Sequence, residues 1–339
     1  RSQPVPSVTG QSYLGRWLRG SELPAGPDDS GARLLPKLRQ PLEMAVAGAD
    51  STTRRAALKP GQAFAHYRID RELGRGAMAT VYRARDERDG RAVALKLLSL
   101  GDDWPEDRLE EARLRLLREA EAATRIQHPD IVNVYEAGEH AGLVYLAMEF
   151  VEGVSLGTHT YEGRLLPPRM ITEMCGRVAD ALQFAHLRGV VHRDIKPANI
   201  IFDQATRRIR IMDFGVARFA DSHATRTGIV LGSPSYMAPE QFDGRPVTGQ
   251  SDLFSLGVSL FQLLTGQLPF RADSMPGLML AIATQPHPPL RTIRPDLPAP
   301  LGAALDRALQ KEPDARFGSA AEMAQVLHDC ARNIDPGLR

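Results

Sequence analysis

Near the middle of the chain, residues 191–201 read Val191-His192-Arg193-Asp194-Ile195-Lys196-Pro197-Ala198-Asn199-Ile200-Ile201. An acid, a lysine and an amide stand two and three residues apart here, between apolar flanks. Pro197 has no backbone N–H and disfavours helix before it, which predicts a loop between ordered elements. A loop held by buried hydrophobic ends is a favourable place for polar groups that face a ligand.

A second acidic motif, Asp213-Phe214-Gly215, follows the strand-like run at 208–212. Asn199 and Asp213 carry the hard oxygen ligands that Mg²⁺ accepts beside phosphate oxygens. Asp194 has the chemistry to take a proton from an alcohol. These residue types together favour phosphoryl transfer.

These segments resemble the catalytic and metal-binding segments of eukaryotic-like (Hanks-type) serine/threonine protein kinases, and the Asp-Ile-Lys-Pro-Ala-Asn wording is similar to their bacterial branch. The resemblance extends over residues 67–331. It implies an α+β fold of two lobes: a small β-rich N-lobe (67–148), a hinge (149–151) and a larger helical C-lobe (152–331). It also implies ATP as cofactor with Mg²⁺, or alternatively Mn²⁺.

A glycine-rich turn, Gly74-Arg75-Gly76, separates strand-like residues 67–73 and 79–84. Alone it fits an ordinary hairpin, but it precedes the strand Ala92-Val93-Ala94-Leu95-Lys96, which favours a loop over phosphates. Ala79 stands at the family's third glycine, and no P-loop motif occurs. The expected nucleotide contacts of this loop are Leu73, Gly74, Arg75, Gly76, Ala77, Met78, Ala79, Thr80 and Val81.

Lys96 lies on an otherwise apolar strand, so a carboxylate partner is expected. The resemblance indicates Glu119 of the following helical segment, with Glu121 as the alternative. It implies that Lys96 positions the α- and β-phosphates, that Asn199 and Asp213 hold the metal, and that Lys196 steadies the phosphoryl group beside the catalytic Asp194.

The segment Glu149-Phe150-Val151 resembles the hinge, whose backbone would bind adenine. Met148 would guard the back of that pocket. The expected apolar walls are Leu73, Val81, Ala94 and Ile201, although each of these fits plain core packing as well.

A polar loop, 216–237, lies between the Asp-Phe-Gly motif and Ala238-Pro239-Glu240. In similar bacterial kinases two threonines at the positions of Thr225 and Thr227 are autophosphorylated, and we expect the same here, with Arg193 receiving the phosphate. Ser233 stands where threonine is usual. Its hydroxyl is retained, so specificity for hydroxyl amino acids is expected.

Several other residues have structural interpretations. His192 is expected to be a packed, hydrogen-bonded histidine rather than an acid–base catalyst. By resemblance, Asp252 braces the catalytic loop and Glu240 pairs with Arg316. Helices are predicted at 170–188, 276–283 and 320–331. Strands are predicted at 131–137 and 143–148. The helix at 276–283 is apolar, which fits core packing or a docking site.

The composition is that of an ordinary soluble protein, with 42 Lys+Arg against 41 Asp+Glu in 339 residues. This balance gives no indication of a nucleic-acid partner. Two distant cysteines and the lack of a long apolar run favour a cytoplasmic chain without a membrane segment. The Pro- and Gly-rich residues 1–62 predict a flexible leader or a regulatory arm. Arg1 at the start is consistent with a fragment or a processed form.

The function predicted from these features is transfer of the γ-phosphoryl group of ATP to Ser/Thr hydroxyls of proteins, with autophosphorylation of the chain's own loop. A homodimer that activates in trans is a further expectation. Two alternatives are a non-catalytic scaffold of the same fold and a kinase for a small metabolite. The retained Lys96, Asp194 and Asp213 weigh against the first, and the long loop up to Glu240 weighs against the second.

Overall fold

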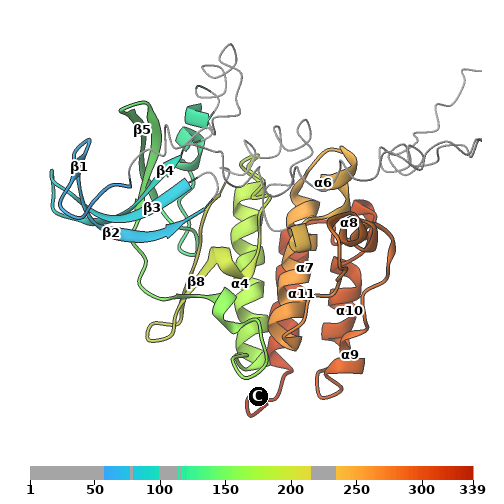
Figure 1. Cartoon of the computed structure of the whole chain (residues 1–339). Coiled ribbons are helices and arrows are strands. Elements are labelled where there is room, and N and C mark those ends of the chain that lie inside the picture. The colour runs from blue at the N-terminus through green and yellow to red at the C-terminus, as the bar shows by residue number, and fades with distance from the viewer. Residues whose placement is uncertain are drawn as a thin grey trace, which may run out of the picture.

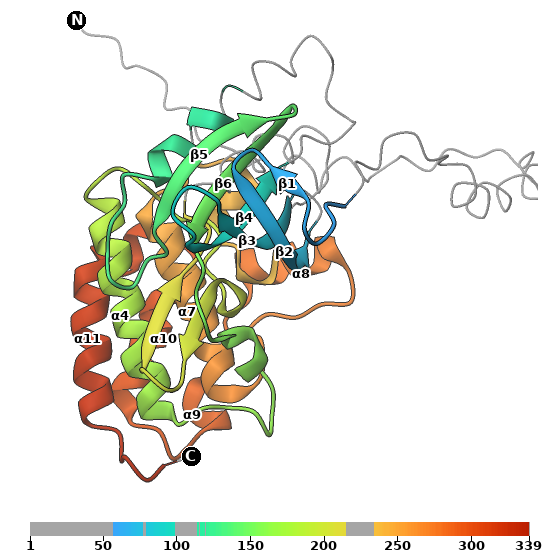
Figure 2. The same ribbon diagram turned by 90° about the vertical axis from the view of Figure 1, so that its left-hand side faces the viewer.

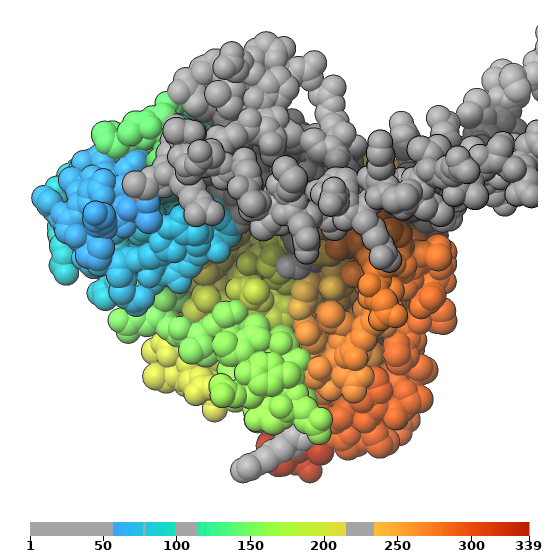
Figure 3. Space-filling view, viewed as in Figure 1, coloured from blue at the N-terminus to red at the C-terminus, as the bar shows by residue number. Residues whose placement is uncertain are grey.

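The computed structural model describes residues 57–76, 79–98, 114, 116–118, 120–214 and 234–338. Strands β1–β6 form one end of the molecule and the helices of the second half form the other (Figure 1). In the space-filling view, the blue N-terminal strands and the orange to red C-terminal helices flank the green and yellow middle of the chain (Figure 3). The predicted α+β, two-lobed architecture is confirmed.

The N-lobe sheet is antiparallel, with the strand order β1-β2-β3-β4-β6-β5. Alternation along β4 divides its side chains between two hydrophobic clusters, because successive residues of a strand point to opposite faces. Leu95 packs in one cluster and Ala94 in the other. Lys96 is therefore on the same face as Ala94. The strands are β1 (Ala63–Phe64), β2 (Tyr67–Arg75), β3 (Ala79–Asp86), β4 (Ala92–Leu98), β5 (Val134–His140) and β6 (Leu143–Glu149).

The glycine-rich turn is shorter than the sequence predicts. β2 continues through Gly74 and Arg75, which pair with Val81 and Thr80 of β3. A Cβ added to Gly74 would meet no atom within 4 Å. None of the side chains that the structure describes therefore fills the space beside this glycine.

The strand predicted to begin at Ile131 begins three residues later, at Val134. Ile131 instead forms an isolated parallel bridge with Ile211. The Val132 amide donates to the Ile211 carbonyl (3.0 Å), and the Ile211 amide donates to the Asp130 carbonyl (2.8 Å). The prediction was wrong there because this segment pairs with the C-lobe before it joins the N-lobe sheet.

The C-lobe is built around α4, α7 and α11, which lie side by side (Figure 2). α7 is buried along almost its whole length. Most of its apolar residues join the main core cluster, whereas Phe254 and Val258 pack in a separate cluster. The observed ends of α4, α8 and α11 lie within two residues of those predicted. The helices are α4 (Pro168–His186), α6 (Pro239–Asp243), α7 (Gly249–Thr265), α8 (Met275–Thr284), α9 (Leu290–Ile293), α10 (Ala299–Ala308) and α11 (Ala320–Arg332).

A small sheet, β7 (Val154–Ser155), β8 (Ile200–Asp203) and β9 (Arg208–Ile211), lies beside α4. The 3₁₀ turn η3 (Pro197–Asn199) leads directly into β8, and Asp213 follows β9 by two residues. The antiparallel pairing of Ile200 with Ile211 brings the two ends of the motif-bearing segments together. None of the helices that the structure describes is both long and apolar enough to cross a membrane.

Candidate active site

The backbone of the loop before β8 is held by one buried carboxylate. Asp252, fully buried in α7, accepts the Arg193 amide at Oδ1 (2.7 Å) and the His192 amide at Oδ2 (2.9 Å). His186, at the end of α4, contacts the same Oδ2 (2.8 Å). Arg193 has a φ of 70°, a conformation that a non-glycine residue keeps only when its surroundings enforce it. The predicted bracing role of Asp252 is confirmed.

His192 is fully buried, and both of its ring nitrogens are engaged. The Asp194 amide donates to Nδ1 (3.2 Å), so this nitrogen is an acceptor. Nε2 must then carry the proton and donate to the Met212 carbonyl (2.8 Å). The ring also packs edge-on against Phe214. These contacts agree with the structural role that the sequence indicates.

Asp194, Lys196 and Asn199 form one hydrogen-bonded group. Lys196 Nζ donates to both carboxylate oxygens of Asp194, at 3.0 and 2.7 Å. Asn199 Nδ2 donates to the carbonyl and to Oδ2 of Asp194, at 2.8 and 2.9 Å. The group is only partly buried, because the Asp194 side chain keeps 28% of its surface exposed. The Asp194 side chain is thus held in a defined orientation and remains open to a ligand.

Lys96 pairs with Asp213, 117 residues further along the chain, at 2.7 Å. In the N-lobe sheet, Lys96 on β4 pairs in register with Val81 on β3 and with Leu146 on β6. Val81 in turn pairs with Gly74 on β2. Burial alone would raise the pKa of Asp213, but the charge and hydrogen bond of Lys96 outweigh it and lower the pKa. Glu119, the predicted partner of Lys96, lies outside the described residues.

The predicted nucleotide wall is only partly assembled from buried residues. Ala94 and Met148 are buried in one cluster, against which Val81 and Val151 pack. Leu73 is 38% exposed. A small cavity is lined by Met148, Asp213 and Phe214. Its remaining lining residues are Ala123, Ile131, Val132, Val134, Leu146 and Ile211.

The remaining predicted contacts have mixed outcomes. Ile201 is half-buried on β8, and Thr80 is half-buried at the start of β3. Arg75 is exposed and pairs with Glu72 at 2.7 Å. The Gly76 amide donates to the Ala79 carbonyl (2.8 Å), which closes the turn. The predicted residues Ala77, Met78, Thr225 and Thr227 lie outside the described residues.

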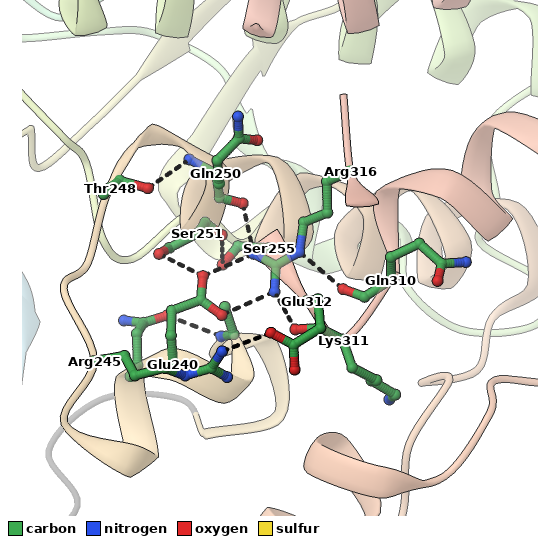
Figure 4. A network of polar contacts seen from close by, with 12 residues as sticks. Glu240, Arg245, Thr248, Gln250, Ser251, Ser255, Gln310, Lys311, Glu312 and Arg316 are labelled. Carbon is green, nitrogen blue, oxygen red and sulfur yellow. Dashed lines mark hydrogen bonds and ion pairs between the residues drawn. The ribbon is translucent and has the colours of Figure 1, made fainter. Parts of the chain in front are cut away.

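The segment that follows residue 233 is anchored by a buried ion pair. Arg316 donates from two nitrogens to the two carboxylate oxygens of Glu240, at 2.7 and 2.8 Å (Figure 4). Ser251 adds a hydrogen bond to Oε1 (2.7 Å). The predicted Glu240–Arg316 pair is confirmed. Gln241 of the same helix donates to the Arg193 carbonyl (3.2 Å), which connects this anchor with the catalytic loop.

Some residues around the site were not predicted from the sequence. His186 contacts Asp252, which is 66 residues distant, and the Glu149 side chain contacts Arg210 across 61 residues. No local pattern signals either pairing. The sequence feature that could have indicated the second pairing is a charged residue between apolar ones, Arg210 between Ile209 and Ile211, because such a residue needs a polar partner.

Comparison with known proteins assigns the family. The protein kinase domain family matches residues 67–329. The chain belongs to the protein kinase family. The kinase domain of PknI from Mycobacterium tuberculosis is similar in structure, with a TM-score of 0.64 and 34% identity over 81% of this chain and all of that one.

The similar curated proteins are bacterial kinases. The serine/threonine-protein kinase PknJ of Mycobacterium tuberculosis is 40% identical over 279 residues, which are 79% of this chain and 46% of PknJ. The serine/threonine-protein kinase Pkn1 of Myxococcus xanthus is 37% identical over 266 residues, 77% of this chain and 38% of Pkn1. The chain thus spans less than half the length of these relatives.

Proposed function

We propose that this kinase-family chain transfers the γ-phosphoryl group of ATP to serine and threonine hydroxyls of proteins. The observation that supports this most is the pairing of Lys96 with Asp213 next to the hydrogen-bonded group of Asp194, Lys196 and Asn199. The Met212 amide donates to the Asn199 carbonyl (2.9 Å), so the segments that carry Asp213 and Asn199 adjoin. The N-lobe supplies one cation and the C-lobe supplies the acids. A triphosphate between them would meet positive charge, metal ligands and a proton acceptor.

Asp194 would orient the substrate hydroxyl and accept its proton as the new O–P bond forms. The bond between the γ-phosphorus and the β–γ bridging oxygen breaks in the same step, and ADP leaves. Lys196, whose Nζ lies 2.7 Å from Asp194 Oδ2, would contact the transferring group and steady its charge. Positioning and electrostatics would lower most of the barrier.

Asn199 and Asp213 fit a divalent metal. The Asp213 side chain is 31% exposed and its pKa is lowered, so an ionised carboxylate faces the site. Asn199 adds an amide oxygen, and such oxygen ligands suit Mg²⁺ or Mn²⁺ bound together with phosphates. When bound, the metal would neutralise charge on the phosphates.

The division into lobes follows from the same proposal. Residues 67–148 would form the upper wall of the nucleotide site, the backbone at 149–151 would bind adenine, and residues 152–331 would bind the protein substrate. Residues 1–62, most of which lie outside the described residues, would be a leader or regulatory arm. The cytoplasm is the expected compartment.

Autophosphorylation would occur at Thr225 and Thr227. Arg193 lies beside the catalytic acid, and its backbone is fixed by Asp252 and Gln241. Its guanidinium is suited to receive a phosphate from that loop. A dimer that activates in trans is part of this proposal.

The decisive experiment compares wild type with Asp194→Asn in the presence of labelled ATP and Mg²⁺. We expect the variant to bind nucleotide but to transfer about 10³-fold more slowly, within the range for a lost general base. The matched control is Asp203→Asn, nine residues on, whose carboxylate accepts the Ala205 amide in a surface turn (2.9 Å). It should behave as wild type.

The labelled residues separate the competing functions. Label on serine or threonine of a protein supports the proposal, and label at Thr225 and Thr227 supports autophosphorylation. A wild-type protein that binds ATP without transfer would be a scaffold. Transfer confined to small molecules would make it a metabolite kinase.

A further inference from the structure

The Glu149 side chain joins the end of β6 to two other parts of the molecule. Asn133 Nδ2 donates to Glu149 Oε2 (3.1 Å), and the Glu149 amide donates to the Asn133 carbonyl (2.8 Å). Arg210 Nε lies 3.3 and 3.4 Å from the two carboxylate oxygens. Asn133, Glu149 and Arg210 together are called the hinge clamp below.

The Arg210 side chain connects three segments. It reaches Glu149 at the hinge, and its Nη1 donates to the Pro129 carbonyl in the loop before β5. Arg210 is part of β9, and Asp213 follows Arg210 by three residues in the sequence. The side chains of Arg210 and Glu149 are 15% and 23% exposed, so solvent screens their interaction less than that of a surface pair.

The loop that carries Asn133 is itself bound to the C-lobe. Asp130 pairs with Arg177 of α4, whose Nε lies 3.1 Å from Oδ2. Ile131 bridges to Ile211 of β9. The hinge clamp therefore fastens the hinge to a loop that is already held by the C-lobe, rather than to a free segment of the N-lobe.

We propose that Arg210 and Glu149 are positioning residues that set the distance between the hinge backbone and the strand leading to Asp213, and so determine nucleotide affinity. The inference rests on the proposed function, because it assumes that the backbone at 149–151 binds adenine. Within the part of the chain that the structure describes, no hydrogen bond joins the clamp side chains to Lys96, Asp194 or Asp213. Loss of the clamp side chains should weaken nucleotide binding more than it slows phosphoryl transfer.

The test measures the KM for ATP, kcat and the Kd of a fluorescent ATP analogue for Arg210→Met. We expect KM and Kd to rise roughly tenfold, the size that corresponds to one charged hydrogen bond, while kcat changes less than threefold. The matched control is Arg208→Met, an exposed arginine two residues earlier on β9. It should leave all three constants within twofold of wild type.

Two further variants separate positioning from general stability. Arg210→Lys keeps the charge and should recover part of the nucleotide affinity. The double variant Glu149→Gln/Arg210→Met should lose no more affinity than the more affected of the two single variants, because each substitution removes the same interaction. A structural defect alone would lower the thermal midpoint and the active fraction, and so kcat, without raising KM.

Two results would overturn the inference: an unchanged KM in folded Arg210→Met, or an equal rise in the Arg208→Met control. Wild type without any transfer activity would refute the proposed function instead. In that case the Kd of the fluorescent analogue still tests the clamp, so the two failures are distinguishable.

Discussion

Two ion pairs of nearly equal length differ in how deeply their charges are buried in this molecule. Lys96–Asp213 and Glu240–Arg316 both have their closest atoms 2.7 Å apart. Their side chains differ in exposure: 11% and 31% in the first pair, 1% and 0% in the second. The distance between the charges is therefore the same in both pairs, and we expect their exposure to distinguish the proposed ligand site from the structural anchor.

The anchor is saturated by protein partners. Arg316 makes two hydrogen bonds to Glu240, and Ser251 donates to the same carboxylate. Burial alone would raise the pKa of Glu240, but its hydrogen bonds with Arg316 and the charge of Arg316 lower it. The remaining Arg316 bonds go to the carbonyl groups of Gln250, Gln310 and Lys311. No capacity for a ligand remains, in contrast to the half-open Asp213.

The largest effect is expected at the open pair. Asp213→Asn removes the charge that holds Lys96 and the proposed metal ligand, so kcat/KM should fall by about 10³-fold or more, as for other lost electrostatic groups in active sites. Because the site is partly solvated, the thermal midpoint should change little. Steady-state kinetics and thermal unfolding of the same sample measure both quantities.

Asp203→Asn is again the control, since it makes the same chemical change in a surface turn. If Asp213→Asn destabilised the fold as strongly as it lowered activity, the open pair would be an anchor too. The contrast between the two pairs would then be lost.

The anchor should show the opposite behaviour. Arg316→Met leaves Glu240 buried without its counter-ion, which should lower the free energy of unfolding by about 3–5 kcal/mol. Urea denaturation followed by circular dichroism measures this loss. The control is Arg332→Met, which breaks an exposed pair with Asp329 and should cost about 0–1 kcal/mol. Equal losses of unfolding free energy in Arg316→Met and Arg332→Met would show that burial does not determine how much an ion pair contributes to stability.

The same contrast explains how much could be predicted from the sequence. Asp194, Lys196 and Asn199 lie within six residues, so one short loop positions them and a motif is sufficient. Asp252 and the Glu240–Arg316 pair were predicted by resemblance and then confirmed by their contacts. The family resemblance thus identified a long-range contact only where a motif contains each of the two partners, as for Glu240 and Arg316, or where the role of one residue is known, as for Asp252.

Pairings without a motif could not be predicted. The Lys96–Asp213 contact was not expected, although both residues were singled out, because a strand pattern does not reveal which acid approaches its face. The contact between Glu149 and Arg210 depends on how β6 and β9 meet. The bridge at Ile131 likewise overrides a pattern that resembles an N-lobe strand. These features arise from tertiary packing.

A third cation, Lys311, provides the smallest and most specific prediction. Its Nζ donates to the Ile282 carbonyl (2.7 Å) and lies 3.8 Å from the centre of the Phe270 ring. No carboxylate pairs with it among the residues that the structure describes. Burial, with a smaller contribution from the charge of Arg316, lowers its pKa to about 8 from an ordinary 10.5.

A lowered lysine pKa has a definite consequence for stability. Below pH 8 the amine is protonated in both folded and unfolded chains, so the cost of burying the charge is constant. Between about pH 8 and 10.5 the unfolded chain binds more protons, and the free energy of unfolding attributable to Lys311 rises with pH. Above 10.5 both states are neutral and the contribution is constant again.

Denaturation of wild type and Lys311→Met at several pH values isolates this contribution, because the tyrosines and other lysines that titrate in the same range are common to both proteins. The difference in stability should shift in favour of wild type from pH 8 to 10.5. Lys311→Arg, which stays charged, should lack this shift. A pH-independent difference would mean that the Ile282 carbonyl and the Phe270 ring compensate the buried charge fully, as the carboxylate of Glu240 does for Arg316.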